Sequence, residues 1–483
     1  MNALMQCFFL GLVCLATLAE AKGFSPTKAT AHSWVDTNRQ QLVDVNQAIW
    51  GLAELGLQET QSSERLATWL STNGFDVKTG VADMPTAFVA EYGSGKPVIG
   101  ILAEFDALPG LSQQAVPFRS AREVEGAGHG CGHSLFGTAS SAAAIAIRNA
   151  MDTHKLKGTV RLYGTPAEET LIGKVYMTKA GLFDDVDAVL GWHPSSKTKT
   201  RYSTSLAMVS LKFIFSGVSA HAAAYPEHGK SALDAVELMN VGVNYMREHI
   251  KDDARIHYVI TGGGGAPNVV PAKTEVWYYI RALAHKDVEK YYRWIVDIAD
   301  GAAQMTRTTV EHRLDTDTHE VLPNRALAEL VHANLTLVGP PNFDSEDSAF
   351  AGKLQKAFSK ESAFEFEREL EKEVLPLPDE PEQGSASTDT GEISWKVPTA
   401  GFQVASYPSG VPIHTWAVVA SAGSSLGQKA MMVAAKTLAG TGIDLLMSPQ
   451  YIEKARAEFQ NRIKGIEFVS LLPVDQKPPL SIR

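Results

Sequence analysis

The sequence predicts an α/β protein in which a ferredoxin-like domain is inserted into a larger, doubly wound catalytic domain. Apolar, strand-like segments alternate with helical ones through the first two hundred residues, a pattern typical of a parallel sheet covered by helices on both faces. From about residue 207 the order becomes β-α-β-β-α-β, which is the ferredoxin-like plan. At 483 residues the chain is also too long for one ordinary core, so two or three domains are expected.

The elements of the larger domain follow from hydrophobic periodicity. Short apolar runs predict buried strands, and longer amphipathic or small-residue-rich segments predict helices. The predicted strands are 97–105, 159–164 and 186–193, and the predicted helices are 43–58 and 135–151.

The inserted domain has its own pattern. Residues 208–217 alternate like a half-exposed strand, and the remaining elements complete the βαββαβ order. These are a helix at 231–250, strands at 255–261 and 274–282, a helix at 287–305 and a strand at 308–314. We therefore expect a first catalytic part at 22–206, the inserted domain at 207–315 and a second catalytic part at 316–483.

The N-terminus resembles an export signal. An apolar run of about a dozen residues ends in Ala19-Glu20-Ala21, a small-x-small cleavage pattern, and it is too short to span a bilayer. We expect a signal peptide at 1–21 and a periplasmic or secreted protein; the alternatives are an uncleaved apolar anchor and a mis-assigned start. Cleavage would leave Cys131 as the one cysteine of the mature chain, which excludes an intramolecular disulfide.

The formal net charge of −10 gives no support to binding of nucleic acid or anionic membranes, since either usually requires a basic patch. We expect no nucleic-acid partner and no stable membrane anchor.

Polar side chains cluster where the predicted strands end. Glu104 and Asp106 follow the first strand, Glu168 and Glu169 follow the second, and His193 ends the third. The carboxyl edge of a parallel sheet is where ligands bind in open α/β folds. Each cluster alone has a structural explanation, such as a core histidine or acids at a helix N-terminus. Three at one edge predict a functional site.

The glycine-rich stretch "GHGCGHSLFG" at 128–137 adds metal-ligand chemistry. Cys131 and His133 offer sulfur and nitrogen in a tight loop, and imidazoles and carboxylates suit the same divalent ions. Thiolate favours zinc. Neighbouring glutamate side chains diverge, so one of Glu168 and Glu169 can bind metal while the other acts as general base towards a metal-bound water.

Seven motifs, in this order along the chain, resemble the M20 family of metallopeptidases, and in particular its amidohydrolase branch, subfamily D. Within that branch, "STDTGEISWKVP" is similar to the group of aminobenzoyl-glutamate utilisation proteins. The resemblance covers nearly all of 30–450. The motifs are "EFDALPG", "GHGCGHSLFG", "TPAEE", "WHP", "SAHAAAYPEHGKSALDA", "APNVVP" and "STDTGEISW…PIHTW".

The resemblance implies a catalytic domain that holds two divalent metal ions, with manganese as the alternative to zinc, and an inserted lid that mediates dimerisation. It implies Glu168 as general base and Asp106 as the acid that supports the metal-binding loop. Glu104 is an uncertain ligand, and His129 fits the surroundings of the loop better than direct ligation. The implied metal ligands are Cys131 (the bridge between the ions), His133, Glu169, His193 and His414.

The lid contributes further residues by resemblance. His221 matches the histidine that reaches the partner protomer's active site and binds the tetrahedral oxyanion. Asn268 and Arg281 match positions that bind the substrate carboxylate or complete the dimer's shared site, and Arg suits a carboxylate through its bidentate geometry. For Arg281 a surface charge at a strand end is the alternative.

We therefore expect a metal-dependent hydrolase that cleaves the amide bond of a small N-acyl amino acid with a free carboxylate, such as aminobenzoyl-glutamate. We expect a homodimer through the lid, with a paralogous chain as another possible partner. A dipeptidase or aminoacylase of the same fold is the alternative, followed by a non-catalytic metal- or ligand-binding protein. A redox protein built on Cys131 is disfavoured, because the mature chain has no resolving thiol.

Overall fold

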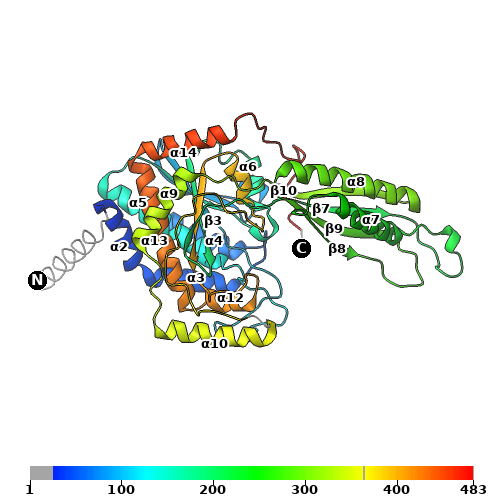
Figure 1. Cartoon of the computed structure of the whole chain (residues 1–483), viewed down its shortest axis with the longest axis horizontal. Coiled ribbons are helices and arrows are strands. Elements are labelled where there is room, and N and C mark those ends of the chain that lie inside the picture. The colour runs from blue at the N-terminus through cyan, green and yellow to red at the C-terminus, as the bar shows by residue number, and fades with distance from the viewer. Residues whose placement is uncertain (1–24, 363–364, 482–483) are drawn as a thin grey trace, which may run out of the picture. The chain divides into compact units, whose positions relative to one another are not determined.

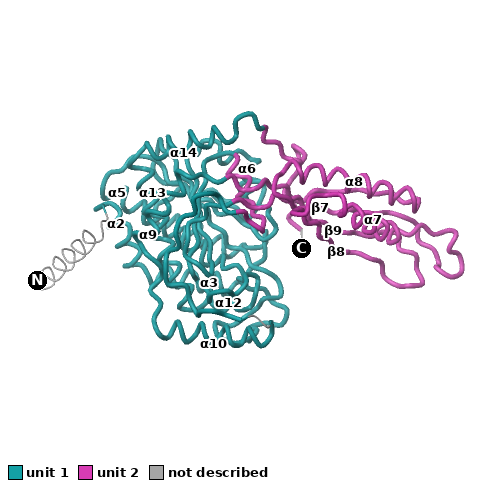
Figure 2. The backbone as a smooth tube through the Cα atoms, in the orientation of Figure 1, with its two compact units in different colours: residues 1–203, 323–382, 396–466 teal, residues 204–322, 383–395, 467–483 magenta. Residues whose placement is uncertain are grey.

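The computed structural model describes residues 25–362 and 365–481. The predicted signal peptide at 1–21, with two of the three cysteines, lies outside the described residues. The chain forms two compact units, shown in different colours in Figure 2. Unit 1 comprises 1–203, 323–382 and 396–466, and unit 2 comprises 204–322, 383–395 and 467–483.

Unit 1 is built on a seven-stranded mixed sheet in the order β1-β2-β4-β3-β5-β11-β6. The four central strands β4, β3, β5 and β11 are parallel, and the strands towards both edges are antiparallel. Every residue of β3 is buried, as expected for a strand covered on both faces. The strands are β1 (Asp76–Thr79), β2 (Phe88–Ser94), β3 (Val98–Ala103), β4 (Gly158–Gly164), β5 (Ala188–Ser195), β6 (Lys199–Arg201) and β11 (Thr399–Ala405).

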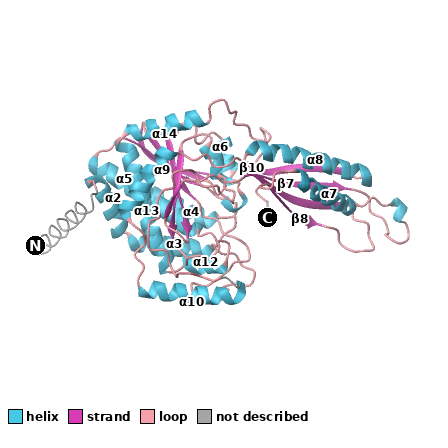
Figure 3. Cartoon of the chain, viewed as in Figure 1, coloured by secondary structure: helices cyan, strands magenta, loops and turns pink. Residues whose placement is uncertain are grey.

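Helices cover this sheet, as Figure 3 shows. They are α2 (Pro26–Thr37), α3 (Arg39–Leu52), α4 (Thr60–Thr72), α5 (His133–His154), α6 (Gly173–Lys179), α9 (Arg325–Val338), α10 (Ser345–Ser362), α12 (Trp416–Ala422), α13 (Ser425–Met447) and α14 (Pro449–Arg462).

The two longest helices of unit 1, α5 and α13, pack against each other and against the central strands. Both are rich in alanine and other small residues, which let helices and sheet approach closely. Most residues of both helices are buried. By length and hydropathy α13 alone among the described helices could cross a membrane, but 83% of its apolar window is buried inside the protein. It is therefore a core helix of unit 1.

Unit 2 contains the four-stranded antiparallel sheet β10-β7-β9-β8, labelled in Figure 1 together with the helices α7 and α8. Both helices pack on this sheet and on each other. In chain order the elements are β7 (Ala207–Ser216), α7 (Ala232–Met246), β8 (Arg255–Gly262), β9 (Lys273–Ala282), α8 (His285–Thr306) and β10 (Thr309–Thr318), and the short α11 (Thr390–Ser394) also belongs to this unit.

The predicted α/β class and the ferredoxin-like order of the inserted domain are confirmed. The catalytic sheet is parallel at its centre and antiparallel towards its edges, because the hairpin-like β1 and β2 and the short β6 complete it. The compact unit around the inserted domain also includes 383–395 and 467–483. The first of these segments contains the whole motif "STDTGEISW".

Candidate metal centre

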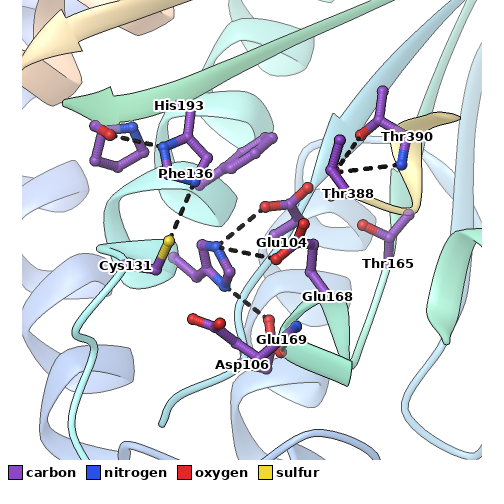
Figure 4. Close-up of polar contacts among 12 residues, drawn as sticks. Glu104, Asp106, Cys131, Phe136, Thr165, Glu168, Glu169, His193, Thr388 and Thr390 are labelled. Carbon is purple, nitrogen blue, oxygen red and sulfur yellow. Dashed lines mark hydrogen bonds and ion pairs between the residues drawn. The ribbon is translucent and has the colours of Figure 1, made fainter. Parts of the chain in front are cut away.

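The carboxyl ends of β3, β4 and β5 lie at one edge of the unit 1 sheet, since these strands are adjacent and parallel. Glu104 follows β3 directly, and the loop 165–172 that contains Glu168 and Glu169 follows β4. His193 lies near the end of β5. The fold therefore brings the three predicted clusters together, as Figure 4 shows.

The loop 128–132 delivers Cys131 and His133 to the same edge. It ends in Gly132, the N-cap of α5, with a φ of +80°. A Cβ at this position would lie 2.9 Å from side-chain carbons of Pro194. Only glycine fits both the left-handed backbone and this close approach, so His133 becomes the first residue of α5.

Asp106 links His133 to the glutamate loop. Its Oδ1 lies 2.8 Å from His133 Nδ1, and its Oδ2 accepts the Glu169 N–H at 2.9 Å. Asp106 is 1% exposed. Because Nδ1 faces a carboxylate, the other ring nitrogen, Nε2, is directed into the cluster, and it lies 3.2 Å from Glu104 Oε2 and 3.9 Å from Glu168 Oε2. An acid that orients a ligating imidazole in this way is typical of metal sites.

Cys131 and His193 face each other in Figure 4. Cys131 Sγ lies 3.3 Å from His193 Nε2. His193 Nδ1 donates to the carbonyl oxygen of Pro194 at 2.6 Å, which fixes the tautomer that leaves Nε2 as an electron-pair donor. Burial and the neighbouring His133 hold the pKa of His193 well below its ordinary value, so the ring is neutral, as a ligand must be.

His414 joins the cluster from the far part of the sequence. It has a left-handed backbone, with φ of 62°, and its N–H donates to Gly130 O at 2.8 Å. Its Nε2 lies 3.3 Å from Glu169 Oε2. Hydrogen bonds with Cys131 and Glu169 raise the pKa of His414 to about 10.

Three overlapping groups of ligand atoms result, in each of which the atoms lie within 4.8 Å of one another. Cys131 belongs to two of the groups, and so does His133. Among the described residues, the buried atom Glu169 Oε1 has no hydrogen-bond partner, and His133 Nε2 makes no hydrogen bond although it forms an ion pair with Glu104 Oε2. Buried polar atoms without partners are rare in folded proteins, and a bound cation would satisfy both. The residues present therefore fit divalent metal. The groups are Cys131-His133-His193, Cys131-Glu169-His414 and Glu104-His133-Glu168.

The two adjacent glutamates diverge, as predicted. Glu169 belongs to the group with Cys131 and His414, whereas Glu168 belongs to the group with His133 and Glu104. Burial and then Glu104 raise the pKa of Glu168 to about 7, a value suited to proton transfer near neutral pH.

The sequence did not decide whether Glu104 and His129 bind metal. Glu104 lies within reach of His133 and Glu168, but its Oε1 also forms a 2.8 Å ion pair with Lys174 Nζ, and both side chains are buried. His129 belongs to none of the ligand groups. Its Nε2 instead pairs with Ile49 O at 3.1 Å, and burial lowers its pKa to about 4. This places His129 in a structural role behind the loop.

The three predicted lid residues lie in unit 2. His221 and Asn268 are on paired segments, since Ala222 N–H donates to Asn268 O at 3.0 Å. Arg281 is half-buried on β9, and its Nη1 donates to Ser387 Oγ at 3.2 Å. Arg281 therefore contacts the motif "STDTGEISW", in which Ser387 is the first residue.

Lys174 and Glu59 are buried ionisable residues beside the site that the sequence did not reveal. Lys174 is fully buried beside Glu104, and the carboxyl of Glu59 bonds to the glutamate loop through Ala167 N–H. Each lies in an ordinary helix or turn that also holds another residue of the same charge type, so no spacing pattern marks it.

This fold and this cluster together define a hydrolase of the metallopeptidase type, built on a mixed α/β domain. The family model of Peptidase family M20/M25/M40 matches residues 100–417. The chain belongs to this family and is a hydrolase.

The relatives agree with the resemblance seen in the sequence. One of the subunits of the p-aminobenzoyl-glutamate hydrolase of Escherichia coli is 41% identical over 88% of this chain and 93% of the relative. The Xaa-Arg dipeptidase of Mus musculus is 29% identical over 90% and 93%. Among solved structures, an aminobenzoyl-glutamate utilization protein from Klebsiella pneumoniae matches with a TM-score of 0.59 over 85% of this chain and 97% of that one. Its identity is 16%, so this likeness shows the fold alone.

Proposed function

We propose that the protein hydrolyses the amide bond of a small N-acyl amino acid, with p-aminobenzoyl-glutamate as the leading substrate. The divergence of Glu168 and Glu169 carries the proposal, because one carboxylate can bind metal while the other remains free to move a proton. The 41% identity to part of a p-aminobenzoyl-glutamate hydrolase, over most of both chains, supports the choice of substrate.

In this proposal Cys131, His133, Glu169, His193 and His414 would hold two divalent ions. Cys131 belongs to two of the ligand groups, as His133 does, and by the family resemblance its thiolate would serve both ions. Bound ions would polarise the amide carbonyl and lower the pKa of water. The thiolate favours zinc, and manganese is the alternative.

Glu168 acts as the general base in this proposal. Its carboxylate accepts a proton from the attacking water and passes it to the nitrogen of the leaving amine. A pKa of about 7 lets the same group take and return the proton at neutral pH. Asp106 keeps Nδ1 of His133 occupied, so that Nε2 remains available to metal.

The lid residues have proposed roles in substrate binding. Arg281 and Asn268 bind the free carboxylate of the substrate, and His221 donates to the oxyanion in the active site of a partner protomer. The guanidinium of Arg281 suits a carboxylate because it can form two parallel hydrogen bonds.

The test is an assay of p-aminobenzoyl-glutamate hydrolysis, measured by the release of p-aminobenzoate and glutamate. Glu168→Gln is expected to lower kcat about 10²–10⁴-fold, as for loss of a general base, while keeping the metal content of the wild type. Full activity of Glu168→Gln would refute the assigned mechanism.

A dipeptidase is the second candidate, favoured by the likeness to Xaa-Arg dipeptidase over 90% of the chain. Comparing kcat/KM for N-acyl glutamates with that for Xaa-Arg dipeptides separates the two. A higher value for the dipeptides would replace the leading substrate.

We further propose a homodimer formed through unit 2. Strand β8 is one of the two edge strands of its sheet, and an exposed apolar edge is a template for pairing with another chain. Residues of β8 and one face of α7 expose large apolar side chains, as expected for an interaction surface. They are Tyr258, Val259 and Ile260 on β8, and Leu238, Val241 and Tyr245 on α7.

Light scattering after size exclusion tests this surface. Val259→Lys is expected to convert dimer to monomer, because a desolvated charge opposes strand pairing. Val124→Lys is the matched control, since Val124 is an exposed valine of unit 1. A monomeric wild type would contradict the homodimer, and a dimer that forms only with a paralogous chain would indicate a multi-subunit arrangement, as the name of the E. coli relative suggests for that enzyme.

The location of the protein is also proposed from the N-terminus. The apolar run ending at Ala21 supports export to the periplasm or outside the cell. Mass spectrometry of the mature N-terminus tests this: cleavage after Ala21 is expected, and an intact Met1 in a cytoplasmic fraction would contradict it.

A further inference from the structure

The loop that carries Glu168 has an unusual backbone. Ala167, immediately before Glu168, has a φ of +55°, and Leu171 has a φ of +57°. Residues with a Cβ adopt this left-handed conformation at a cost in free energy. Such a conformation persists only where surrounding contacts impose it. Ala167 is also fully buried, so the contacts that impose its conformation come from the protein interior.

One of these contacts is made by Glu59, a residue 108 positions earlier in the chain. The Ala167 N–H donates to Glu59 Oε1 at 2.8 Å. The hydroxyl of Thr86 donates to Glu59 Oε2 at 3.0 Å, and the exposed fraction of Glu59 is 0%. Both oxygens of this buried carboxyl are therefore used, one of them on the catalytic loop.

Glu59 can make this contact because Glu54 caps the helix in its place. Glu59 is the N-cap residue of α4, but its side chain makes no capping bond to that helix. Glu54 accepts instead from the N–H groups of Gln61 and Ser62, at 3.1 and 2.8 Å. The first turn of α4 is thus satisfied by Glu54, and the Glu59 side chain is directed to Ala167.

The turn 56–59, which contains Glu59, also packs directly against the loop 165–172. A Cβ at Gly56 would lie 2.9 Å from both Cα and Cβ of Ala167. Gly56 and Glu59 therefore contact Ala167 from one turn of the chain, and any larger residue at 56 would displace it.

We propose that Glu59 is a positioning residue that holds Ala167 in the left-handed conformation and thereby aims the carboxylate of Glu168. Glu59 itself belongs to no ligand group of the metal centre. If Ala167 relaxed to a right-handed conformation, the peptide that joins it to Glu168 would rotate and carry that side chain away from His133. This inference rests on the proposed role of Glu168 as general base.

The test compares two substitutions of similar size. Glu59→Gln keeps an oxygen for the Ala167 N–H and supplies an amide that can pair with the Thr86 hydroxyl, so it should retain kcat within a few-fold. Glu59→Leu removes the acceptor and should lower kcat on p-aminobenzoyl-glutamate about 10²-fold, the effect of a small misplacement of a catalytic group. KM and metal content by elemental analysis should be unchanged.

A readout without catalysis accompanies these assays. Hydrogen exchange of a peptide covering 165–172, measured on metal-free protein, should be faster in Glu59→Leu than in Glu59→Gln or the wild type. Adding Ala167→Gly to Glu59→Leu should recover part of kcat, because glycine adopts the left-handed conformation without the cost of a Cβ. A merely structural role of Glu59 would not be rescued at Ala167.

Wild-type kcat in Glu59→Leu would overturn the proposal, as would a loss of kcat that only follows loss of metal. If Glu59→Leu does not fold, Gly56→Ala tests the same loop by pushing on Ala167; lowered kcat with retained metal is expected, and wild-type kcat would overturn the proposal. The proposed function fails separately, by full activity of Glu168→Gln.

Discussion

Replacement of Asp106 by asparagine tests how the metal loop and the glutamate loop are joined. The carboxylate of Asp106 serves two donors at once, His133 Nδ1 at 2.8 Å and the Glu169 N–H at 2.9 Å. Asparagine has one acceptor oxygen, and its amide group faces the second donor without being able to accept from it. One buried donor is then unpaired, which costs about 1–3 kcal/mol.

The same change loosens the orientation of a metal ligand. Loss of an outer partner of a ligating histidine typically lowers metal affinity about 10–100-fold. We expect Asp106→Asn to lower the free energy of unfolding, measured by urea denaturation, and to lower zinc affinity, measured by competition with a chelator. Asp185→Asn is the control, because Asp185 is an exposed acid paired with Arg161. Wild-type zinc affinity in Asp106→Asn would refute the assignment of His133 as a ligand oriented by Asp106.

Two further predictions concern pH. Burial, with Asp106 nearby, raises the pKa of Glu59 from 4.5 to about 8. Between these pH values the native state keeps a proton that the unfolded chain loses. The contribution of Glu59 to stability therefore falls as pH rises from about 4.5 to 8. The difference in unfolding free energy between Glu59→Gln and the wild type, at equal metal loading, should therefore grow in favour of Glu59→Gln across that window; a flat difference would contradict the buried protonated carboxyl. The pKa of His414 is raised to about 10 by Cys131 and Glu169, so a metal ion that binds His414 must displace a proton. Zinc affinity should therefore rise with pH in the wild type and rise less steeply in His414→Ala. Equal dependence of zinc affinity on pH in the two proteins would argue against His414 as a ligand.

The sequence predicted the central elements of the fold because their periodicity is strong. The predicted strands at 97–105, 159–164 and 186–193 correspond to β3, β4 and β5. Parallel strands have their carboxyl ends at one edge, so polar residues just beyond them could be placed together without knowing the structure. The meeting of Glu104, Glu168 and His193 followed from that rule alone.

The other features of the site and fold depend on contacts between residues distant in sequence, which no local sequence pattern predicts. His414 lies more than two hundred residues beyond β5, and its place beside Glu169 could be anticipated only from the resemblance to a known family. Glu59 and Lys174 are buried ionisable side chains whose partners are distant in sequence. The docking of 383–395 and 467–483 in unit 2 likewise depends on tertiary packing, which hydrophobic periodicity does not encode.

The central claim is that Glu168 moves the proton in hydrolysis while neighbouring residues hold metal. The most direct measurement is turnover of p-aminobenzoyl-glutamate by the wild type and by Glu168→Gln, with metal content determined on the same samples. We predict two ions per chain in both proteins and a kcat lower by about 10²–10⁴-fold in the variant. Unchanged turnover in Glu168→Gln, or a wild type that holds no more than one ion when fully active, would contradict the account.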